Sequence, residues 1–308
     1  MSEINPVLSI YMTTYNGEKY LDTAIQSVLN QSFTNWEFII INNFSTDNTR
    51  LILKDYLKNK KIKIVNTDKL LPRTSALNFA LKHTSKESKF LMNLDSDDIL
   101  DYEWVKRGID YIYKRKEVGC ISGAAYIINE DNEIMEIFKV SSFDSKINDH
   151  FYYTFPIVHS STIFRKDLLE QSEYIYNENI EIGQDWDLFI NISRKTEIHY
   201  LNNFSVYWRR YDKSVTGDKK NQITSRLDKI KNLDRGKLYI SNFKHKIKNR
   251  SRRGIENLVL SFLYLKNGEI YKFIYRILIS FILNPIAILN NNKVLSLFGK
   301  RKEFYQSK

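Results

Sequence analysis

The sequence lacks several features that define whole classes of protein. Among its 308 residues there is one cysteine, Cys120, which excludes an internal disulfide and fits a reducing compartment. There is no run of about 18 uncharged apolar residues, so we expect no membrane-spanning helix. The first residues, Met1–Pro6, lack the basic region and long apolar core of a secretory signal. Together these absences favour a folded cytoplasmic protein.

Positive charges outnumber negative ones, and the net charge is unevenly distributed along the chain. The formal net charge is +11. Residues 219–308 hold 21 Lys and Arg against 5 Asp and Glu, a net charge of +16, whereas residues 1–218 hold 26 against 31, a net charge of −5. We therefore predict a mildly acidic domain over residues 1–218 and a basic extension over residues 219–308. A strongly basic segment indicates an anionic partner, either a membrane surface or a nucleic acid.

Apolar runs alternate with amphipathic stretches along the first hundred residues. The pattern predicts strands at Leu8–Thr14, Phe38–Ile41, Ile62–Val65 and Phe90–Leu94, and helices at Glu18–Gln31, Ser45–Leu57 and Ser75–His83. This alternation predicts an α/β fold with a mostly parallel sheet and helices on both faces.

The rest of the chain continues with strands and then becomes helical. We predict a hairpin of Gly119–Ile128 with Ile134–Phe138, a short strand at Thr162–Phe164, a helix at Asp185–Ser193 and a strand at Ser205–Arg209. Helical segments follow at Arg226–Lys248, Leu258–Leu265 and Ile270–Leu289, the last ended or kinked by Pro285. This extension is interpreted as a helical appendage packed on the domain, as an amphipathic membrane-surface element or as a nucleic-acid arm.

Three acids follow the fourth predicted strand within four positions: Asp95, Asp97 and Asp98. In an open α/β sheet, ligands bind outside the carboxyl ends of the strands. Clustered carboxylates repel one another unless a cation compensates them, and their oxygens suit Mg²⁺ or Mn²⁺ held together with a phosphate-bearing substrate. The alternative is an acidic start of the next helix, with Asp97 or Asp98 as its cap.

Four segments, one of which contains these acids, resemble the motifs of the family 2 glycosyltransferases. The segments are Thr13–Leu21 with Ala24–Ser32, Asn42–Thr49, Asp95–Asp98 and Gly183–Leu188, and they occur in the family's order between residue 8 and about residue 216. The resemblance implies a GT-A (Rossmann-like) fold. It also implies transfer of a sugar from a nucleotide sugar with inversion at the anomeric carbon.

The resemblance assigns roles to the three acids that follow the fourth predicted strand. It makes Asp97 a direct ligand of Mn²⁺ or Mg²⁺, which would stabilise the leaving diphosphate. Asp95 would meet the ribose of the nucleotide or contribute to the metal site through its bound water. Asp98 would cap the following helix instead.

Inverting displacement requires a base that removes the proton of the acceptor hydroxyl. Asp185 matches the family's catalytic base, and its alternative role is to cap the helix that starts near Trp186. Asp187 lies two positions further along the chain, and we expect it to have a supporting role at most. The family often has Glu where this chain has Gln184, which removes a neighbouring negative charge and should ease the ionisation of Asp185.

Donor recognition departs from the family pattern at one position. The family usually has Asp, which accepts a hydrogen bond from the nucleotide base, where this chain has Asn42. An amide can still pair with uracil, so a uridine-linked donor is modestly favoured over thymidine- or guanosine-linked donors. Arg73 falls where the family has an Arg that contacts base or phosphate, its alternative being a solvated charge. Thr13 and Tyr15 are expected to line the nucleotide pocket. Asp47 should shape the second loop or cap the helix after it.

The segment Tyr207–Thr216 resembles the family's closing motif. Arg209 matches its Arg and would neutralise diphosphate charge. Tyr211 stands where the family often has a His, so a metal contact made by that His in relatives is missing or replaced. His159 and His199 are expected to be structural, and Cys120 to be an inert core thiol.

These features predict an inverting hexosyl- or N-acetylhexosaminyl-transferase of polysaccharide synthesis. The acceptor would be a saccharide or lipid-linked saccharide, and the basic extension would dock on the anionic inner face of the cell membrane. Two alternatives remain: a sugar-nucleotide-binding protein without turnover, suggested by Asn42, Gln184 and Tyr211, and a nucleic-acid binder that uses the extension. No recognised nucleic-acid motif supports the second, so no nucleic-acid partner is expected.

Overall fold

A computed structural model of the chain describes residues 6–140, 146–152, 154–169, 175–180, 182–211, 221–240 and 243–284. The chain divides into two compact units. Unit 1 comprises Met1–Asn148 and Phe155–Ser214, and unit 2 comprises Asp149–Thr154 and Val215–Lys308. The predicted boundary after residue 218 lies outside the described residues, so the proposed domain limits remain a prediction.

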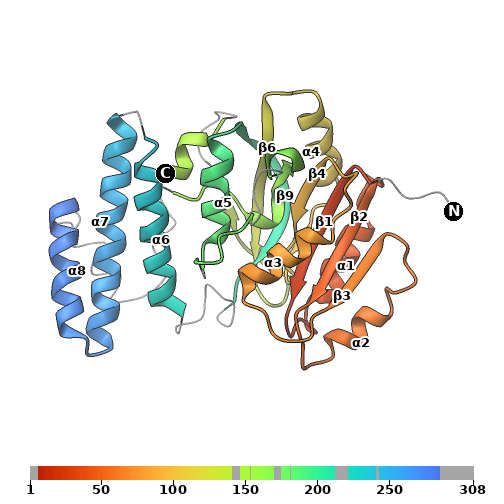
Figure 1. The fold of residues 1–308 in the computed structure, drawn as a ribbon, viewed down its shortest axis with the longest axis horizontal. Helices are drawn as coiled ribbons and strands as arrows, with labels where there is room; N and C mark the ends of the chain where they lie inside the picture. Colours follow the sequence, from red (N-terminus) through yellow and green to blue (C-terminus); the bar gives the residue numbers. More distant parts are fainter. Residues whose placement is uncertain are drawn as a thin grey trace. The chain divides into compact units, whose positions relative to one another are not determined.

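Unit 1 is built on one mixed sheet whose first half is parallel (Figure 1). Strands β1 (Leu8–Thr14), β2 (Trp36–Asn42), β3 (Ile62–Asn66) and β4 (Phe90–Asn93) run parallel in the order β3-β2-β1-β4. The sheet continues with β8 (Ile163–Arg165), β6 (Val118–Ile128), β9 (Glu197–Arg209) and β5 (Ile99–Leu100), and β7 (Ile134–Phe138) pairs with β6. Strand β8 is antiparallel to both β4 and β6, whereas β9 runs parallel to β6. The predicted mostly parallel α/β fold is confirmed.

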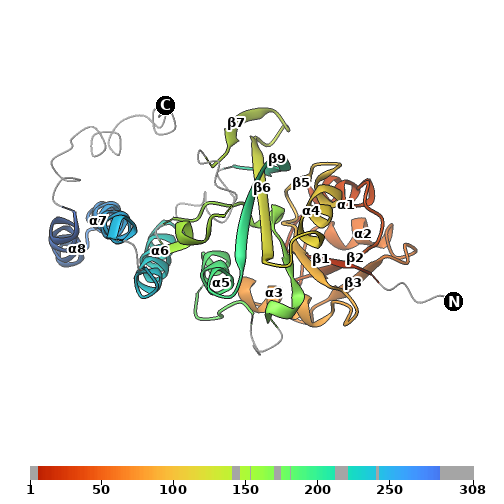
Figure 2. The same ribbon diagram turned by 90° about the horizontal axis from the view of Figure 1, so that it is seen from above.

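Helices cover both faces of this sheet (Figure 2). On one face lie α1 (Leu21–Leu29) and α4 (Trp104–Tyr113), and on the other lie α3 (Arg73–Lys82) and α5 (Gln184–Ser193). The short helix α2 (Thr49–Lys54) follows β2, and 3-10 turns span Asn148–Tyr152, His159–Ser161 and Lys166–Leu169. Because both faces are covered, β1 is buried almost throughout, and its alternate residues Ile10 and Met12 join a core with Leu21 and Ile25 of α1.

Several predicted boundaries are wrong. The helix expected over Glu18–Gln31 spans Leu21–Leu29, the helix expected through Leu57 ends at Lys54, and the strand expected over Ser205–Arg209 already begins at Glu197. The helix expected from Ser45 begins at Thr49, because the Ser45 hydroxyl instead accepts the amide of Asn16 in a loop contact. The helix expected from Ser75 begins at Arg73, directly after Pro72, whose fixed φ suits the start of a helix. A helix was expected after the three acids, but the bounds of α4 were not predicted, although its Trp104, Val105, Ile109 and Ile112 form a buried face.

Unit 2 contains three helices among its described residues. They are α6 (Gln222–Lys237), α7 (Phe243–Lys266) and α8 (Ile270–Leu283), and both α6 and α8 pack on α7. Ile230, Leu260 and Tyr264 form the buried core of this packing. The helix predicted over Arg226–Lys248 is divided, since α6 already ends at Lys237. Helix α8 ends at Leu283, ahead of Pro285, as expected because a residue before proline avoids the helical conformation.

Within the described ranges, none of the helices combines the length and the apolar character needed to cross a bilayer.

Candidate active site

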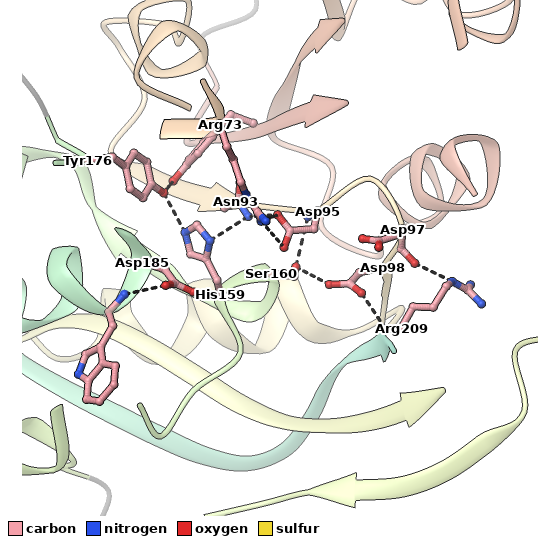
Figure 3. A network of polar contacts seen from close by, with 12 residues as sticks. Arg73, Asn93, Asp95, Asp97, Asp98, His159, Ser160, Tyr176, Asp185 and Arg209 are labelled. Atoms are coloured by element: carbon pink, nitrogen blue, oxygen red, sulfur yellow. Dashed lines mark hydrogen bonds and ion pairs between the residues drawn. The ribbon is translucent and has the colours of Figure 1, made fainter. Parts of the chain in front are cut away.

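The polar residues of the predicted motifs meet at the carboxyl ends of β1, β2 and β4 (Figure 3). The loop after β4 carries the three acids, α3 contributes Arg73 from its first turn, and α5 contributes Asp185 from its first turn. Parallel strands bring their carboxyl ends to one edge of the sheet, and helix α3 starts there for the same topological reason. Segments far apart in the sequence thus share one site.

Asp95 is the best-compensated carboxylate of the site. It lies 3.3 Å from Nη2 of Arg73 and accepts a hydrogen bond of 3.0 Å from Nδ2 of Asn93. Its backbone amide donates to the Ser160 hydroxyl at 3.2 Å. Burial alone would raise the pKa of Asp95, but the positive charge of Arg73, followed by His159 and the Asn93 hydrogen bond, holds that pKa below its ordinary value. Asp95 is therefore ionised and held in one orientation.

Asp97 has less compensation. It accepts a hydrogen bond of 3.1 Å from the Tyr211 hydroxyl. Burial, and then the negative charge of Asp95, raise the pKa of Asp97, while the Tyr211 bond and Arg73 act in the opposite direction. A cation close to this carboxylate would stabilise its ionised form and so counteract both causes. Tyr211, at the family's His position, thus contacts Asp97 directly.

A divalent cation at these acids would need phosphate oxygens of the substrate as additional ligands. In the described part of the chain, no cluster of three or more His, Cys, Asp or Glu side chains is arranged to hold a metal ion. Mg²⁺ sites in nucleotide-dependent enzymes commonly use one or two carboxylates and take their remaining ligands from substrate phosphates and water. Asp97, with Asp95 beside it, fits such a substrate-completed site.

Asp98 links the loop to the neighbouring strand. It is fully buried and accepts a hydrogen bond of 2.5 Å from the Ser160 hydroxyl and one of 2.8 Å from the Arg209 amide. Burial, and then the charges of Asp97 and Asp95, raise the pKa of Asp98 well above its ordinary value. The predicted capping role is wrong, because the next helix begins at Trp104 with Glu103 at its N-cap.

Asp185 faces the same cluster. The pKa of Arg73 is lowered by burial but raised overall, because the negative charges of Asp95, Asp185 and Asp97 act on it. The charges of all three carboxylates therefore act on one guanidinium, and Asp95 contacts it directly at 3.3 Å. The N-cap of α5 is Gly183, in a left-handed conformation with φ of 92°, so the capping role considered for Asp185 is wrong. Asp185 instead accepts the amide of Trp186 at 2.8 Å, and Asp187 is buried.

A buried chain of hydrogen bonds leads from Asp95 through Asn93 to His159 and Tyr176 (Figure 3). Asn93 Nδ2 contacts both Asp95 and Nδ1 of His159, the latter at 3.2 Å. Nε2 of His159 lies 2.8 Å from the Tyr176 hydroxyl, which lies 2.5 Å from the Tyr11 hydroxyl. The Asn93 amide donates one hydrogen to each partner, so Nδ1 of His159 must accept and Nε2 must carry the proton.

This chain of hydrogen bonds escaped the sequence analysis. His159 was expected to be structural, which its burial and neutral tautomer support, and burial also lowers its pKa. The only sequence signal was Asn93, a polar residue at the end of an apolar strand. His199, by contrast, contacts Tyr111 and Glu197, and Cys120 is a buried thiol whose pKa burial raises, as expected.

The residues expected to hold the nucleoside lie at the ends of β1 and β2. Thr13 is half-buried in β1, and Tyr15 is half-exposed just after it. Asn42, the last residue of β2, donates from Nδ2 to Asn66 at 2.8 Å, and its Oδ1 accepts the Ser45 amide at 3.3 Å. Its amide therefore shapes the loop, and its predicted contact with the base stays a prediction.

Two further side chains fix the loops around this edge. Asn43 pairs with the backbone of Leu71, donating to its carbonyl and accepting its amide, both at 2.9 Å, and so holds the segment that leads to Arg73. Asp47 accepts the amides of Glu18 at 3.1 Å and Thr49 at 3.0 Å. The expectation that Asp47 shapes the second loop is confirmed.

Arg209 is 3% exposed, and its guanidinium is directed at loops of the protein. Nε donates to the Asp97 carbonyl at 2.9 Å, Nη1 to the Asn129 carbonyl at 2.7 Å, and Nη2 to Oδ1 of Asn132 at 2.6 Å. Its guanidinium carbon lies 4.2 Å from the centre of the Tyr20 ring. The predicted diphosphate contact stays a prediction, and residues 212–216 of the closing motif lie outside the described residues.

Comparison with known proteins identifies the family to which this geometry corresponds. The model of the family described as glycosyl transferase family 2 matches residues 9–172. An uncharacterized glycosyltransferase of Haemophilus influenzae is 26% identical over 246 residues, which cover 73% of this chain and 76% of the relative.

A second relative, of Escherichia coli, is named UDP-Glc:alpha-D-GlcNAc-diphosphoundecaprenol beta-1,3-glucosyltransferase WfgD. It is 32% identical over 120 residues, which cover 36% of this chain and 46% of the relative. Among solved structures, the mannosyltransferase PcManGT from Pyrobaculum calidifontis, in complex with GDP-Man and Mn²⁺, superposes with a TM-score of 0.61. It shares 13% identity and the alignment covers 95% of this chain and 81% of that one, a likeness that shows a common fold.

Proposed function

The chain belongs to glycosyl transferase family 2, and from this premise we propose that it moves a sugar from a nucleotide-sugar donor to a saccharide acceptor in polysaccharide synthesis. The observation that carries the proposal is the ion pair of Arg73 with Asp95 at the carboxyl end of β4, with Asp97 on the same loop and Asp185 in the first turn of α5 beside it (Figure 3). Such a cluster can hold both the leaving diphosphate and the attacking hydroxyl.

The proposed reaction is a direct displacement with inversion. Asp185 takes the proton of the acceptor hydroxyl as that oxygen attacks the anomeric carbon. The Arg73 guanidinium, fixed by its ion pair with Asp95, presents positive charge to the donor phosphates. Asp97 and Asp95 would hold Mn²⁺ or Mg²⁺, and when bound such an ion stabilises the developing charge of the diphosphate as a Lewis acid.

We propose a uridine-linked donor. The name of the Escherichia coli relative specifies UDP-Glc, whereas PcManGT, which shares the fold, was solved with GDP-Man, so the fold accommodates more than one base. In the proposed site, Thr13, Tyr15 and Asn42 surround the base and Asp95 approaches the ribose. Arg209 is proposed to act on the donor's diphosphate end, in addition to its contacts with the Asp97 loop.

The proposed acceptor is a lipid-linked saccharide at the inner face of the membrane. The net charge of +16 on residues 219–308 supports docking at an anionic surface. The Escherichia coli relative is named for a lipid-linked acceptor, a sugar on diphosphoundecaprenol.

Two isosteric substitutions test the assignment of roles. We expect Asp185→Asn to lower transfer about 10²–10⁴-fold while leaving donor affinity unchanged, because it removes a base and no donor contact. We expect Asp97→Asn to abolish the dependence of donor binding on Mn²⁺. Transfer and hydrolysis of UDP-sugars, together with calorimetric donor binding, measure both effects.

The matched control is Asp110→Asn, which removes an exposed carboxylate of α4. Native circular dichroism combined with unchanged transfer in Asp185→Asn would remove the base assignment. Mn²⁺-dependent donor binding that survives Asp97→Asn would remove the metal assignment.

A further inference from the structure

Helix α8 presents large apolar side chains on its exposed side. Tyr271 is 92% exposed and Ile282 is 67% exposed. The exposed large apolar residues of α8 are Ile270, Tyr271, Ile274, Tyr275, Leu278, Phe281 and Ile282. They recur at spacings of three and four residues, so they share one face of the helix.

This face is distinct from the one that packs against the rest of unit 2. Phe273 packs on the core formed by Ile230, Leu260 and Tyr264, and Ser280 is fully buried. Arg276 donates from Nη1 to Asn257 of α7 at 2.9 Å. Helix α8 thus uses one side for its own unit and turns an apolar side outward.

The net charge of the segment formed by α7 and α8 is positive. Residues 243–284 contain nine Lys and Arg but only two acids, Glu256 and Glu269. Helix α8 itself contains Lys272 and Arg276 and no acid. A second copy of the same surface would bring like charges together, whereas an anionic lipid surface attracts each nearby cation by about 1 kcal/mol.

The dimensions of α8 indicate how it would meet a bilayer. Its 14 residues extend about 21 Å at 1.5 Å per residue, which is less than the hydrocarbon thickness of about 30 Å. It therefore cannot cross the bilayer. An amphipathic helix with basic flanks lies in the plane of the interface, where tyrosine side chains are favoured.

We propose that α8 is an interfacial helix, and that its outward face inserts into an anionic membrane leaflet. The proposed function includes docking by net charge at an anionic surface, and this inference rests on it for the presence of the acceptor at the membrane. Insertion of named apolar side chains is a separate claim from attraction by net charge, since it predicts a loss of binding without any change of charge.

The test uses the full chain and vesicles of phosphatidylcholine with or without phosphatidylglycerol. We expect the wild type to co-sediment with the anionic vesicles. The variant Tyr271→Ser/Leu278→Ser/Phe281→Ser should bind them at least roughly tenfold more weakly, because three inserted side chains are lost. The matched control Leu51→Ser/Leu57→Ser/Met135→Ser removes three exposed apolar side chains of unit 1 and should bind like the wild type.

Three outcomes would overturn the inference. They are a wild type that does not bind anionic vesicles, an α8 variant that binds as the wild type does, and an α8 variant that turns a dimer into a monomer in sedimentation without lipid. The last would identify a second copy as the occupant. Hydrolysis of a UDP-sugar in solution, measured in parallel, separates these outcomes from failure of the proposed transferase activity.

Discussion

Replacing Arg209 by lysine distinguishes a phosphate ligand from a residue that holds two loops together. Lysine keeps the positive charge but replaces the planar fork of donors by a single ammonium group. The Arg209 fork joins the loop of Asp97 to the turn at Asn129 and Asn132, and its face stacks on Tyr20. The residue is buried, so water cannot replace these partners fully.

The expected magnitude follows from the partners that lose their donor. Asn132 is exposed and can be rehydrated, which leaves the carbonyls of Asp97 and Asn129 as the costly acceptors. Hydrogen bonds from a charged donor contribute about 1.5–3 kcal/mol each, and an ammonium group can retain roughly one of the two. With part of the stacking on Tyr20 lost, we expect Arg209→Lys to lower the free energy of unfolding by about 2–4 kcal/mol.

Urea unfolding followed by tryptophan fluorescence measures this change. All four tryptophans, at positions 36, 104, 186 and 208, belong to unit 1, so their fluorescence reports on the unit that holds the site. The control is Arg210→Lys. Arg210 is the next residue along the chain and also stacks on an aromatic ring, its guanidinium carbon lying 3.8 Å from the centre of the Trp208 ring. The control should remain within about 1 kcal/mol of the wild type.

The reasoning would be refuted by a specific pair of results. If Arg209→Lys unfolds like the wild type while its affinity for UDP falls tenfold or more, the guanidinium serves the diphosphate and its loop contacts contribute little. A loss of stability with unchanged UDP affinity would confirm the loop role and remove Arg209 from the proposed donor site.

Two further substitutions test the buried polar groups. The pKa of Asp98 is raised in the folded state by burial, so its contribution to stability is present below the unfolded pKa of about 4 and is lost as pH rises through the folded value. Asp98→Asn should therefore flatten the decline of unfolding free energy above about pH 4; a variant that follows the wild-type curve at every pH would contradict this. Tyr176→Phe leaves the Nε2 proton of His159 without its acceptor and should cost about 1–3 kcal/mol, whereas Tyr11→Phe, which removes only the end of the chain of hydrogen bonds, should cost less. Equal losses in the two variants, measured by urea unfolding, would contradict this order of effects.

Local patterning determined much of the fold. The strands of the parallel half could be predicted to within about two residues, because continuous apolar runs such as Leu8–Thr14 have few alternatives to a buried strand. The three acids after Phe90–Leu94 and the acid at position 185 were identified as site residues on the resemblance to a family. The positions of these acids within elements then followed from the strand and helix that precede or contain them.

Only the tertiary structure decided which of these residues act on one another. Ser160 and Asn93 carry no recognisable motif, yet one joins Asp95 to Asp98 and the other joins Asp95 to His159. The separation between Asp98 and Arg209 is 111 residues, and no local pattern reports on a hydrogen bond across that distance. Capping by Asp98 was a sound local expectation that failed for this reason. Its buried carboxylate accepts hydrogen bonds from β9 and from the turn at Ser160, and the next helix starts six residues later, at Trp104. Sequence periodicity reports on which face of an element is buried, whereas the pairing of polar groups depends on how distant elements approach one another.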